Sequence, residues 1–130
     1  MLLLSIPTES EWQEKLGNER YRVMRLKETQ RAFSGTYVSC KREGTYCCAA
    51  CDVPLFRSED KYDIGCGWPT FTKPVESKAI YYLEDYSFVF KRYEVLCRSC
   101  GCHLGHVFRD GPPPKHLRYT INSISLSLKK

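Results

Sequence analysis

The sequence has little of what marks a membrane or secreted protein. It contains no apolar run near the ~18 residues that a membrane-spanning helix needs. Residues 1–7, although apolar, are too short for a signal peptide and lack a basic start. It also shows no internal repeat and no low-complexity tract. We therefore expect a cytoplasmic protein that does not contact a membrane.

Concentrated positive charge is absent as well. The 20 Lys and Arg residues against 15 Asp and Glu residues give a net charge of +5, and the basic residues are scattered in groups no larger than pairs such as Lys91-Arg92. Proteins that bind nucleic acid usually concentrate such charge on one face or helix. The composition therefore argues against a nucleic-acid partner and favours a contribution of this charge to solubility.

The chain does have enough length for one hydrophobic core, and it is rich in cysteine. At 130 residues it is expected to form a single domain, residues 1–130, because most domains contain about 100–150 residues. Eight cysteines would suggest a disulfide framework in a secreted protein. In a protein without that context, paired Cys-x-x-Cys motifs indicate metal or redox chemistry instead.

Helices are predicted near the N-terminus. Thr8 and Glu11 have the spacing of a capping box, in which each side chain accepts a hydrogen bond from the other residue's backbone. A helix is therefore expected from this point to Gly17, and a second one over about residues 19–28. We interpret both helices as packing elements that cover a sheet.

The remainder of the chain is typical of a β protein. Residues 30–37 are interpreted as a loop anchored by Phe33, and the sequence then changes to short β-like runs separated by Gly, Pro and Asp. A hairpin is predicted at residues 84–87 between two of these runs. The predicted strands are residues 45–48, 55–57, 79–84, 88–97, 106–108, 118–122 and 125–128.

Two Cys-x-x-Cys pairs, Cys48 with Cys51 and Cys97 with Cys100, provide the strongest chemical signal. Four thiolates can close a tetrahedron around zinc and leave no open position, which predicts a structural ion rather than a catalytic one. Closing the intervening loop costs on the order of 3–4 kcal/mol, whereas structural zinc contributes roughly 10–16 kcal/mol. Cys47 in place of Cys48, and a redox pair or buried thiols without metal, remain alternatives.

Cys66 is the main candidate for a reactive thiol among the other cysteines. It lies between two glycines and is followed by Trp68 and Pro69, so it is expected on a mobile turn beside a large aromatic face. A single cysteine more often packs as a small hydrophobic residue, but this setting favours a functional role.

Several blocks of the sequence together resemble the methionine-R-sulfoxide reductases of the B type. The resemblance extends over about residues 19–128, including the spacing of both cysteine pairs. It implies a mainly β (α+β) fold, with two antiparallel β-sheets, N-terminal helices packed against them, and a structural zinc far from the active site. The matching blocks are RAFSG at 31–35, PLF at 54–56, KYD at 61–63, GCGWPTF at 65–71, HLGHVF at 103–108, DGP at 110–112 and RYTINS at 118–123.

The resemblance also implies an activity, which is the reduction of the R epimer of methionine sulfoxide in proteins, with thioredoxin as the reductant. In this chemistry a thiolate attacks the sulfoxide sulfur, and the resulting sulfenic acid condenses with a second thiol. A monomer is expected. The implied roles are Cys66 as the resolving thiol, Trp68 as the wall for the substrate methyl group, His103, His106 and Asn122 as proton donors or positioning groups, and Asp110 and Arg118 as organisers of the site.

Simpler roles remain open for some of these residues. His103 and His106 could be core histidines bonded to the backbone, and Arg118 could pair with Asp110 at the surface.

Thr120 departs from the pattern, because the family has a cysteine or selenocysteine at this position. An alcohol is far less acidic than a thiol and cannot be oxidised to a sulfenic acid. The chain is therefore predicted to be inactive or severely impaired. Thr120 is either an introduced substitution or a natural variant that keeps the pocket for binding or uses Cys66 or Cys102 instead.

Two other classes of function compete with this interpretation. The first is a non-catalytic, zinc-held β module that binds a methionine-containing peptide or a small ligand, which Thr120 supports and the retained Cys66 opposes. The second is a zinc domain that binds nucleic acid, which the scattered charge opposes.

Overall fold

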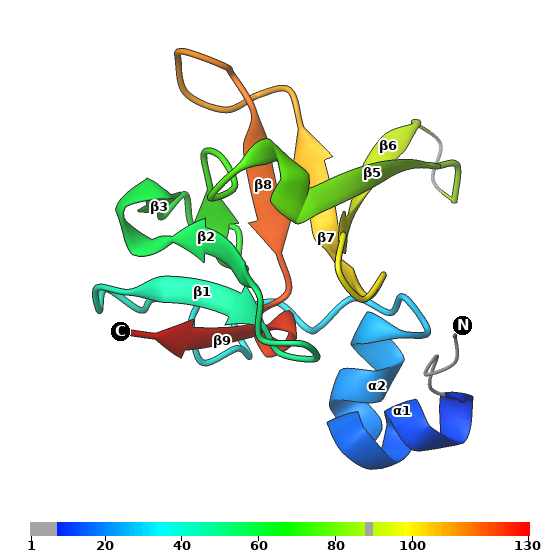
Figure 1. The fold of residues 1–130 in the computed structure, drawn as a ribbon. Helices are drawn as coiled ribbons and strands as arrows, with labels where there is room; N and C mark the ends of the chain where they lie inside the picture. The colour runs from blue at the N-terminus through cyan, green and yellow to red at the C-terminus, as the bar shows by residue number, and fades with distance from the viewer. Residues whose placement is uncertain (1–7, 88–89) are drawn as a thin grey trace.

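The computed structural model describes residues 8–87 and 90–130. Two helices precede nine strands, which form two antiparallel sheets (Figure 1). The smaller sheet has the order β2-β1-β9 and the larger one the order β3-β4-β8-β7-β6-β5. The strands are β1 Thr45–Cys48, β2 Pro54–Arg57, β3 Lys61–Tyr62, β4 Thr70–Phe71, β5 Ile80–Asp85, β6 Arg92–Cys97, β7 His103–Phe108, β8 Arg118–Ile121 and β9 Leu126–Lys129. The predicted fold class is confirmed.

The helices α1 (Glu9–Leu16) and α2 (Asn18–Met24) lie together at one end of the larger sheet (Figure 1). The predicted capping box is present, because Thr8 Oγ1 accepts from the Glu11 backbone and Glu11 Oε1 accepts from the Thr8 backbone, at 3.1 and 2.8 Å. The second helix ends at Met24, earlier than predicted. In the described part of the chain, no helix has the length and apolarity needed to cross a membrane.

The predicted strands are present with shifted ends. Two further strands, β3 and β4, were missed because each has two residues, too few for an alternating pattern. β7 begins three residues before its predicted start. The antiparallel pairing of β5 and β6 confirms a hairpin, but Glu84 and Asp85 belong to β5, so its turn begins later than predicted. The prediction for residues 1–7 and the predicted strand positions Phe88 and Val89 lie outside the described residues. The anchoring role expected of Phe33 is wrong, since its side chain is 68% exposed.

Aromatic side chains pack the two sheets together. Phe56 of β2 stacks on Phe71 of β4, with ring centroids 4.5 Å apart, and Tyr46 of β1 contacts the same ring edge-on at 5.2 Å. Tyr119 of β8 lies directly opposite Phe71 of β4 and is also buried. Because successive side chains of a strand point to opposite faces, this burial directs Thr120 to the other face of the larger sheet.

Candidate functional site

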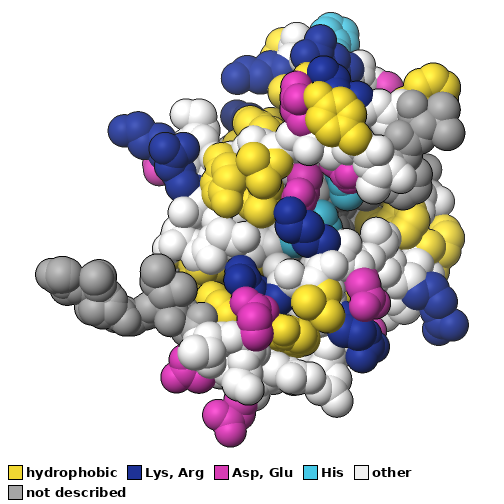
Figure 2. Space-filling model, turned by 90° about the vertical axis from the view of Figure 1, so that its right-hand side faces the viewer, with side chains coloured by type: hydrophobic (Ala, Val, Ile, Leu, Met, Phe, Trp, Pro, Cys, Tyr) yellow, Lys and Arg dark blue, Asp and Glu magenta, His cyan; other side chains and the backbone are white. Residues whose placement is uncertain are grey.

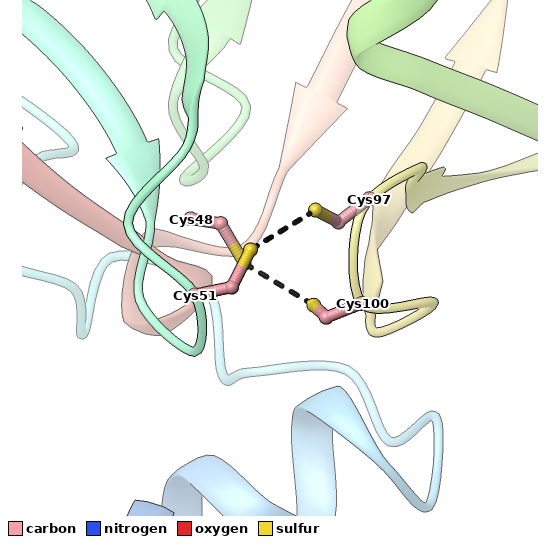
Figure 3. Close-up of side chains that lie close together, drawn as sticks. All are labelled: Cys48, Cys51, Cys97 and Cys100. Atoms are coloured by element: carbon pink, nitrogen blue, oxygen red, sulfur yellow. Dashed lines mark hydrogen bonds between the residues drawn. The ribbon is translucent and has the colours of Figure 1, made fainter. Parts of the chain in front are cut away.

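The two Cys-x-x-Cys pairs meet at one point between the sheets. Cys48 and Cys51 come from the end of β1, and Cys97 and Cys100 from the end of β6 (Figure 3). The four sulfur atoms lie within 4.8 Å of one another, and the cross pairs Cys48–Cys100 and Cys51–Cys97 are 3.7 and 3.6 Å apart. With Zn–S bonds of about 2.3 Å, a tetrahedron has sulfur–sulfur edges of about 3.8 Å. The donor set therefore fits zinc.

The two pairs have the same local geometry, which explains their spacing. After each second cysteine the chain turns at a residue with positive φ, Asp52 at 69° and Gly101 at 76°. The backbone N–H of that residue donates to the carbonyl of the first cysteine, at 2.8 Å for Cys48 and 2.7 Å for Cys97. Each turn therefore directs two thiols toward the same side.

Two thiols of this cluster, Cys48 and Cys97, resist ionisation, whereas hydrogen bonds, chiefly from Cys102, lower the pKa of Cys100. The hydrogen bond with Cys100 is the main reason why the pKa of Cys97 is raised to about 12, and burial adds to the effect. Hydrogen bonds with Cys100 and Cys97 likewise hold the pKa of Cys48 well above its ordinary value. A bound divalent cation offsets this penalty, since thiolates are the form that binds metal. Cys47, the alternative ligand, is outside the cluster, and its Sγ contacts the Thr45 carbonyl at 3.9 Å.

A separate pocket of about 130 Å³ opens over the outer face of the larger sheet. In the strand register, Thr120 of β8 lies opposite Thr70 of β4 on one side and His106 of β7 on the other. Opposed residues share a face, with Cβ atoms about 4.5–5.5 Å apart. The pocket brings together six of the predicted site residues, which are Cys66, Trp68, His106, Arg118, Thr120 and Asn122.

Arg118 is held firmly beside Thr120. Its Nε and Nη2 donate to the two carboxylate oxygens of Asp110 at 2.7 and 3.0 Å, and its Nη1 donates to Thr120 Oγ1 at 2.9 Å. The guanidinium also stacks on the Phe108 ring at 4.3 Å. The hydrogen bond with Asp110 raises the pKa of Arg118 and lowers that of Asp110. Asp110 is 64% exposed but Arg118 only 18%, so the pair extends from the surface into the pocket.

Each of the two predicted histidines is held by a carboxylate. His103 is 2% exposed, and its Nδ1 lies 2.7 Å from Glu94 Oε2. Its buried Nε2 has no hydrogen-bond partner among the described residues. The rings of His103 and His106 meet edge-on at 5.5 Å. Backbone bonding of these histidines, the simpler alternative, is therefore not what is observed.

His106 has a defined protonation state. Its Nε2 lies 2.8 Å from Asp85 Oδ2, which also accepts from Arg92 at 3.2 Å. Burial lowers the pKa of His106 despite the opposing effect of Asp85, so the ring is neutral at neutral pH. Because an ionised carboxylate only accepts hydrogen bonds, the ring proton is on Nε2 and Nδ1 is an acceptor. In the view of Figure 2, histidine side chains lie recessed between basic and acidic side chains near the middle of the molecule.

Cys66 lies on a tight turn that lines the pocket and is partly exposed. Its Sγ is 3.4 Å from Thr70 Oγ1 and 3.5 Å from the Trp68 carbonyl oxygen. The next residue, Gly67, has φ 94°, and a Cβ there would lie 2.7 Å from the Ala32 Cβ. The turn therefore packs tightly on residues 32–33, which limits the mobility expected from the sequence.

Gln30 is a site residue that the sequence did not indicate. Its backbone carbonyl accepts from Trp68 Nε1 at 2.7 Å, and its backbone N–H donates to Asn122 Oδ1 at 3.0 Å. Its buried side chain accepts from the Ile124 N–H at 2.9 Å. One loop residue thus fixes both Trp68 and Asn122. Asp85 and Glu94 were also missed. Asp85 lies opposite Arg92 and Glu94 opposite His106 in the strand register, yet they contact His106 and His103 respectively, so only the folded structure shows these pairs.

The fold and the site define a mainly β protein with a four-cysteine cluster suited to a metal. Separate from this cluster is a pocket lined by one thiol and by both aromatic and polar side chains, as expected of a thiol-based redox protein. Residues 16–130 match the SelR domain model. The chain belongs to the SelR family.

Relatives are similar over nearly the whole chain. A protein of Azotobacter vinelandii named peptide methionine sulfoxide reductase MsrB is 56% identical over 118 residues, covering 91% of this chain and 89% of the relative. Proteins with the same name from Acinetobacter baylyi and Pseudomonas entomophila are each 52% identical over 122 residues. These alignments cover 94% of this chain and 88% and 93% of the relatives.

Proposed function

We propose that this chain carries the substrate pocket of a peptide methionine-R-sulfoxide reductase, in which Thr120 occupies the position of the attacking thiol. The observation that supports this most directly is the 2.9 Å hydrogen bond from Arg118 Nη1 to Thr120 Oγ1. A guanidinium at this distance would stabilise a thiolate at position 120 and lower its pKa. The names of the relatives supply the substrate class.

The pocket offers a role to each of its other residues. The Trp68 ring, fixed through Gln30, forms an apolar wall for the methyl group of the substrate. The remaining amide hydrogen of Asn122 can position the sulfoxide oxygen, since Asn122 Oδ1 is already engaged. The His106 ring lines the pocket, and His103, whose buried Nε2 has no hydrogen-bond partner among the described residues, lies behind it with the two rings 5.5 Å apart.

The reaction with a thiol at position 120 has two stages. The thiolate attacks the sulfoxide sulfur, the oxygen is protonated, and methionine leaves a sulfenic acid behind. Cys66, which lines the same pocket, then condenses with the sulfenic acid to give a disulfide and water, and thioredoxin reduces the disulfide. Zinc bound by Cys48, Cys51, Cys97 and Cys100 would be structural, since these four thiols leave no open position, and it would cross-link the two sheets.

Thr120 removes the first stage of this reaction. Its hydroxyl is a poor nucleophile without a base to activate it, and it cannot accept the sulfoxide oxygen. The chain as it stands is therefore inactive or severely impaired in thioredoxin-dependent turnover.

The experiment is a comparison of Thr120→Cys with Thr120→Ser. The rate of thioredoxin-coupled reduction of a peptide containing methionine-R-sulfoxide is expected to rise by at least about 10²-fold in Thr120→Cys. Removing the nucleophile of an enzyme lowers its rate by at least this factor, and the variant restores the nucleophile. Thr120→Ser, which keeps the oxygen, is expected to remain at the level of the unaltered protein. Equal rates in the two variants would refute the assignment of position 120.

A second candidate function is the non-catalytic binding of a methionine-containing peptide, and Thr120 itself favours it. The pocket and its apolar wall are retained although the thiol is absent. Calorimetric titration with peptides containing the R and the S sulfoxide distinguishes the two functions. Equal affinity for both epimers would support the binding module, whereas preference for R supports the reductase pocket.

A further inference from the structure

The four cysteines outside the metal cluster differ in position. Cys102 is fully buried, whereas Cys40 and Cys47 line other hollows, of about 440 and 620 Å³. Cys66 lines the pocket that contains Thr120 and is partly exposed there. Among the cysteines, all of which lie in the described part of the chain, Cys66 is therefore the one that a ligand in this pocket can reach.

Polar groups surround Cys66 within the pocket. Thr70 Oγ1 lies 3.4 Å from its Sγ and donates its own proton to the Trp68 carbonyl at 3.0 Å, so it is placed to accept the thiol proton. Arg118 lines the same pocket as Cys66, so its positive charge faces a ligand held there.

Thr120 itself is oriented to hold the sulfoxide oxygen. Arg118 donates to Thr120 Oγ1, so the hydroxyl's own proton is left to be donated to another acceptor. Thr120 and Thr70 are cross-strand neighbours, which places this hydroxyl next to the group that contacts Cys66. A sulfoxide in the pocket would thus have a donor for its oxygen on one side and a thiol on the other.

We propose that Cys66 is the attacking thiol of this chain and reduces methionine sulfoxide slowly by a one-cysteine route. The inference rests on the proposed function of the pocket. The Cys66 thiolate attacks the sulfoxide sulfur and takes up its oxygen, and one proton is consumed. The products are methionine and a Cys66 sulfenic acid, so the substrate sulfur gains the two electrons that the cysteine sulfur loses.

Among the described residues, no second thiol lines the pocket to condense with this sulfenic acid. An external dithiol must therefore complete the cycle. Its first thiol condenses with the sulfenic acid to form a mixed disulfide and water, and its second thiol displaces Cys66. The route differs from the two-cysteine reaction because the sulfenic acid persists until a reductant arrives.

The test is a single-turnover reaction of the unaltered protein with a short peptide containing methionine-R-sulfoxide, in the presence of dimedone and without reductant. Mass spectrometry is expected to find a dimedone adduct on Cys66, with methionine peptide formed in an equal amount. The rate is expected to be about 10²-fold below that of Thr120→Cys, since displacement of the nucleophile from its productive position has costs of this size. The peptide containing methionine instead of its sulfoxide is expected to give no adduct.

Variants separate this inference from the proposed function. Cys66→Ser and Cys66→Ala are both expected to lose the adduct and the methionine peptide, and Cys40→Ser to keep both. Sulfoxide-dependent labelling at Cys40, Cys47 or Cys102 overturns the inference. The inference is also overturned if Thr120→Cys forms the methionine peptide and the unaltered protein does not. In that case the proposed function stands. Absence from both proteins overturns both. Circular dichroism of each variant verifies that it is folded.

Discussion

Replacing Cys48 with serine removes one of the four sulfur atoms that join the two sheets. Cys47→Ser is a matched control, because it changes the same atom in the neighbouring buried residue, whose sulfur is outside the cluster. Metal analysis is expected to find about one zinc per chain in Cys47→Ser and much less in Cys48→Ser. The comparison tests the choice between two adjacent cysteines, which the sequence left open.

The size of the effect follows from the loop that the cluster closes. Cys51 and Cys97 are 46 positions apart and come from different sheets. Cross-linking a loop of this length removes unfolded-state entropy worth about 4 kcal/mol, against a total stability of about 5–15 kcal/mol for a typical domain. For a chain of this size, the loss corresponds to a fall in Tm of roughly 12–20 °C.

Thermal unfolding followed by circular dichroism measures this difference. A chelator added to the unaltered protein is expected to lower the Tm as Cys48→Ser does and to have little further effect on that variant. A Tm for Cys48→Ser within about 3 °C of that for Cys47→Ser, with equal zinc in both, would show that the cluster does not join the sheets.

Two further predictions concern the pocket. Gln30→Ala leaves the Ile124 N–H without its side-chain partner, so urea unfolding is expected to show a loss of about 1–2 kcal/mol. The exposed Gln13→Ala is expected to stay within about 0.5 kcal/mol, and equal losses would contradict the role of Gln30. Because the pKa of His106 is lowered in the fold from 6.5, its contribution to stability is complete above about pH 6.5 and is lost as the pH falls through the folded value. Urea unfolding between pH 7.5 and 5.5 is expected to show this decline, less steeply in His106→Gln, and stability that increases toward pH 5.5 would contradict it.

Much of the architecture could be predicted from the sequence because it depends on local signals. The capping box at Thr8 needs residues three apart, and each Cys-x-x-Cys turn needs one residue of positive φ directly after it. Strand alternation depends on the nearest neighbours alone. The end of α2 was harder to predict, because the chain leaves the helix to bring Gln30 to the pocket, a contact with residues about 90 positions away.

The sequence by itself determined the four-cysteine donor set and the motifs that mark the family, since short-range spacing encodes both, and the resemblance carried by those motifs implied the two antiparallel sheets. The tertiary structure decided that the cluster takes Cys48 rather than Cys47, that Asp85 and Glu94 hold the histidines, and that Cys66 shares a pocket with Thr120. These outcomes depend on strand register and on contacts between distant segments. A register error of one residue would turn Cys48, Asp85 and Glu94, which lie on strands, to the opposite face.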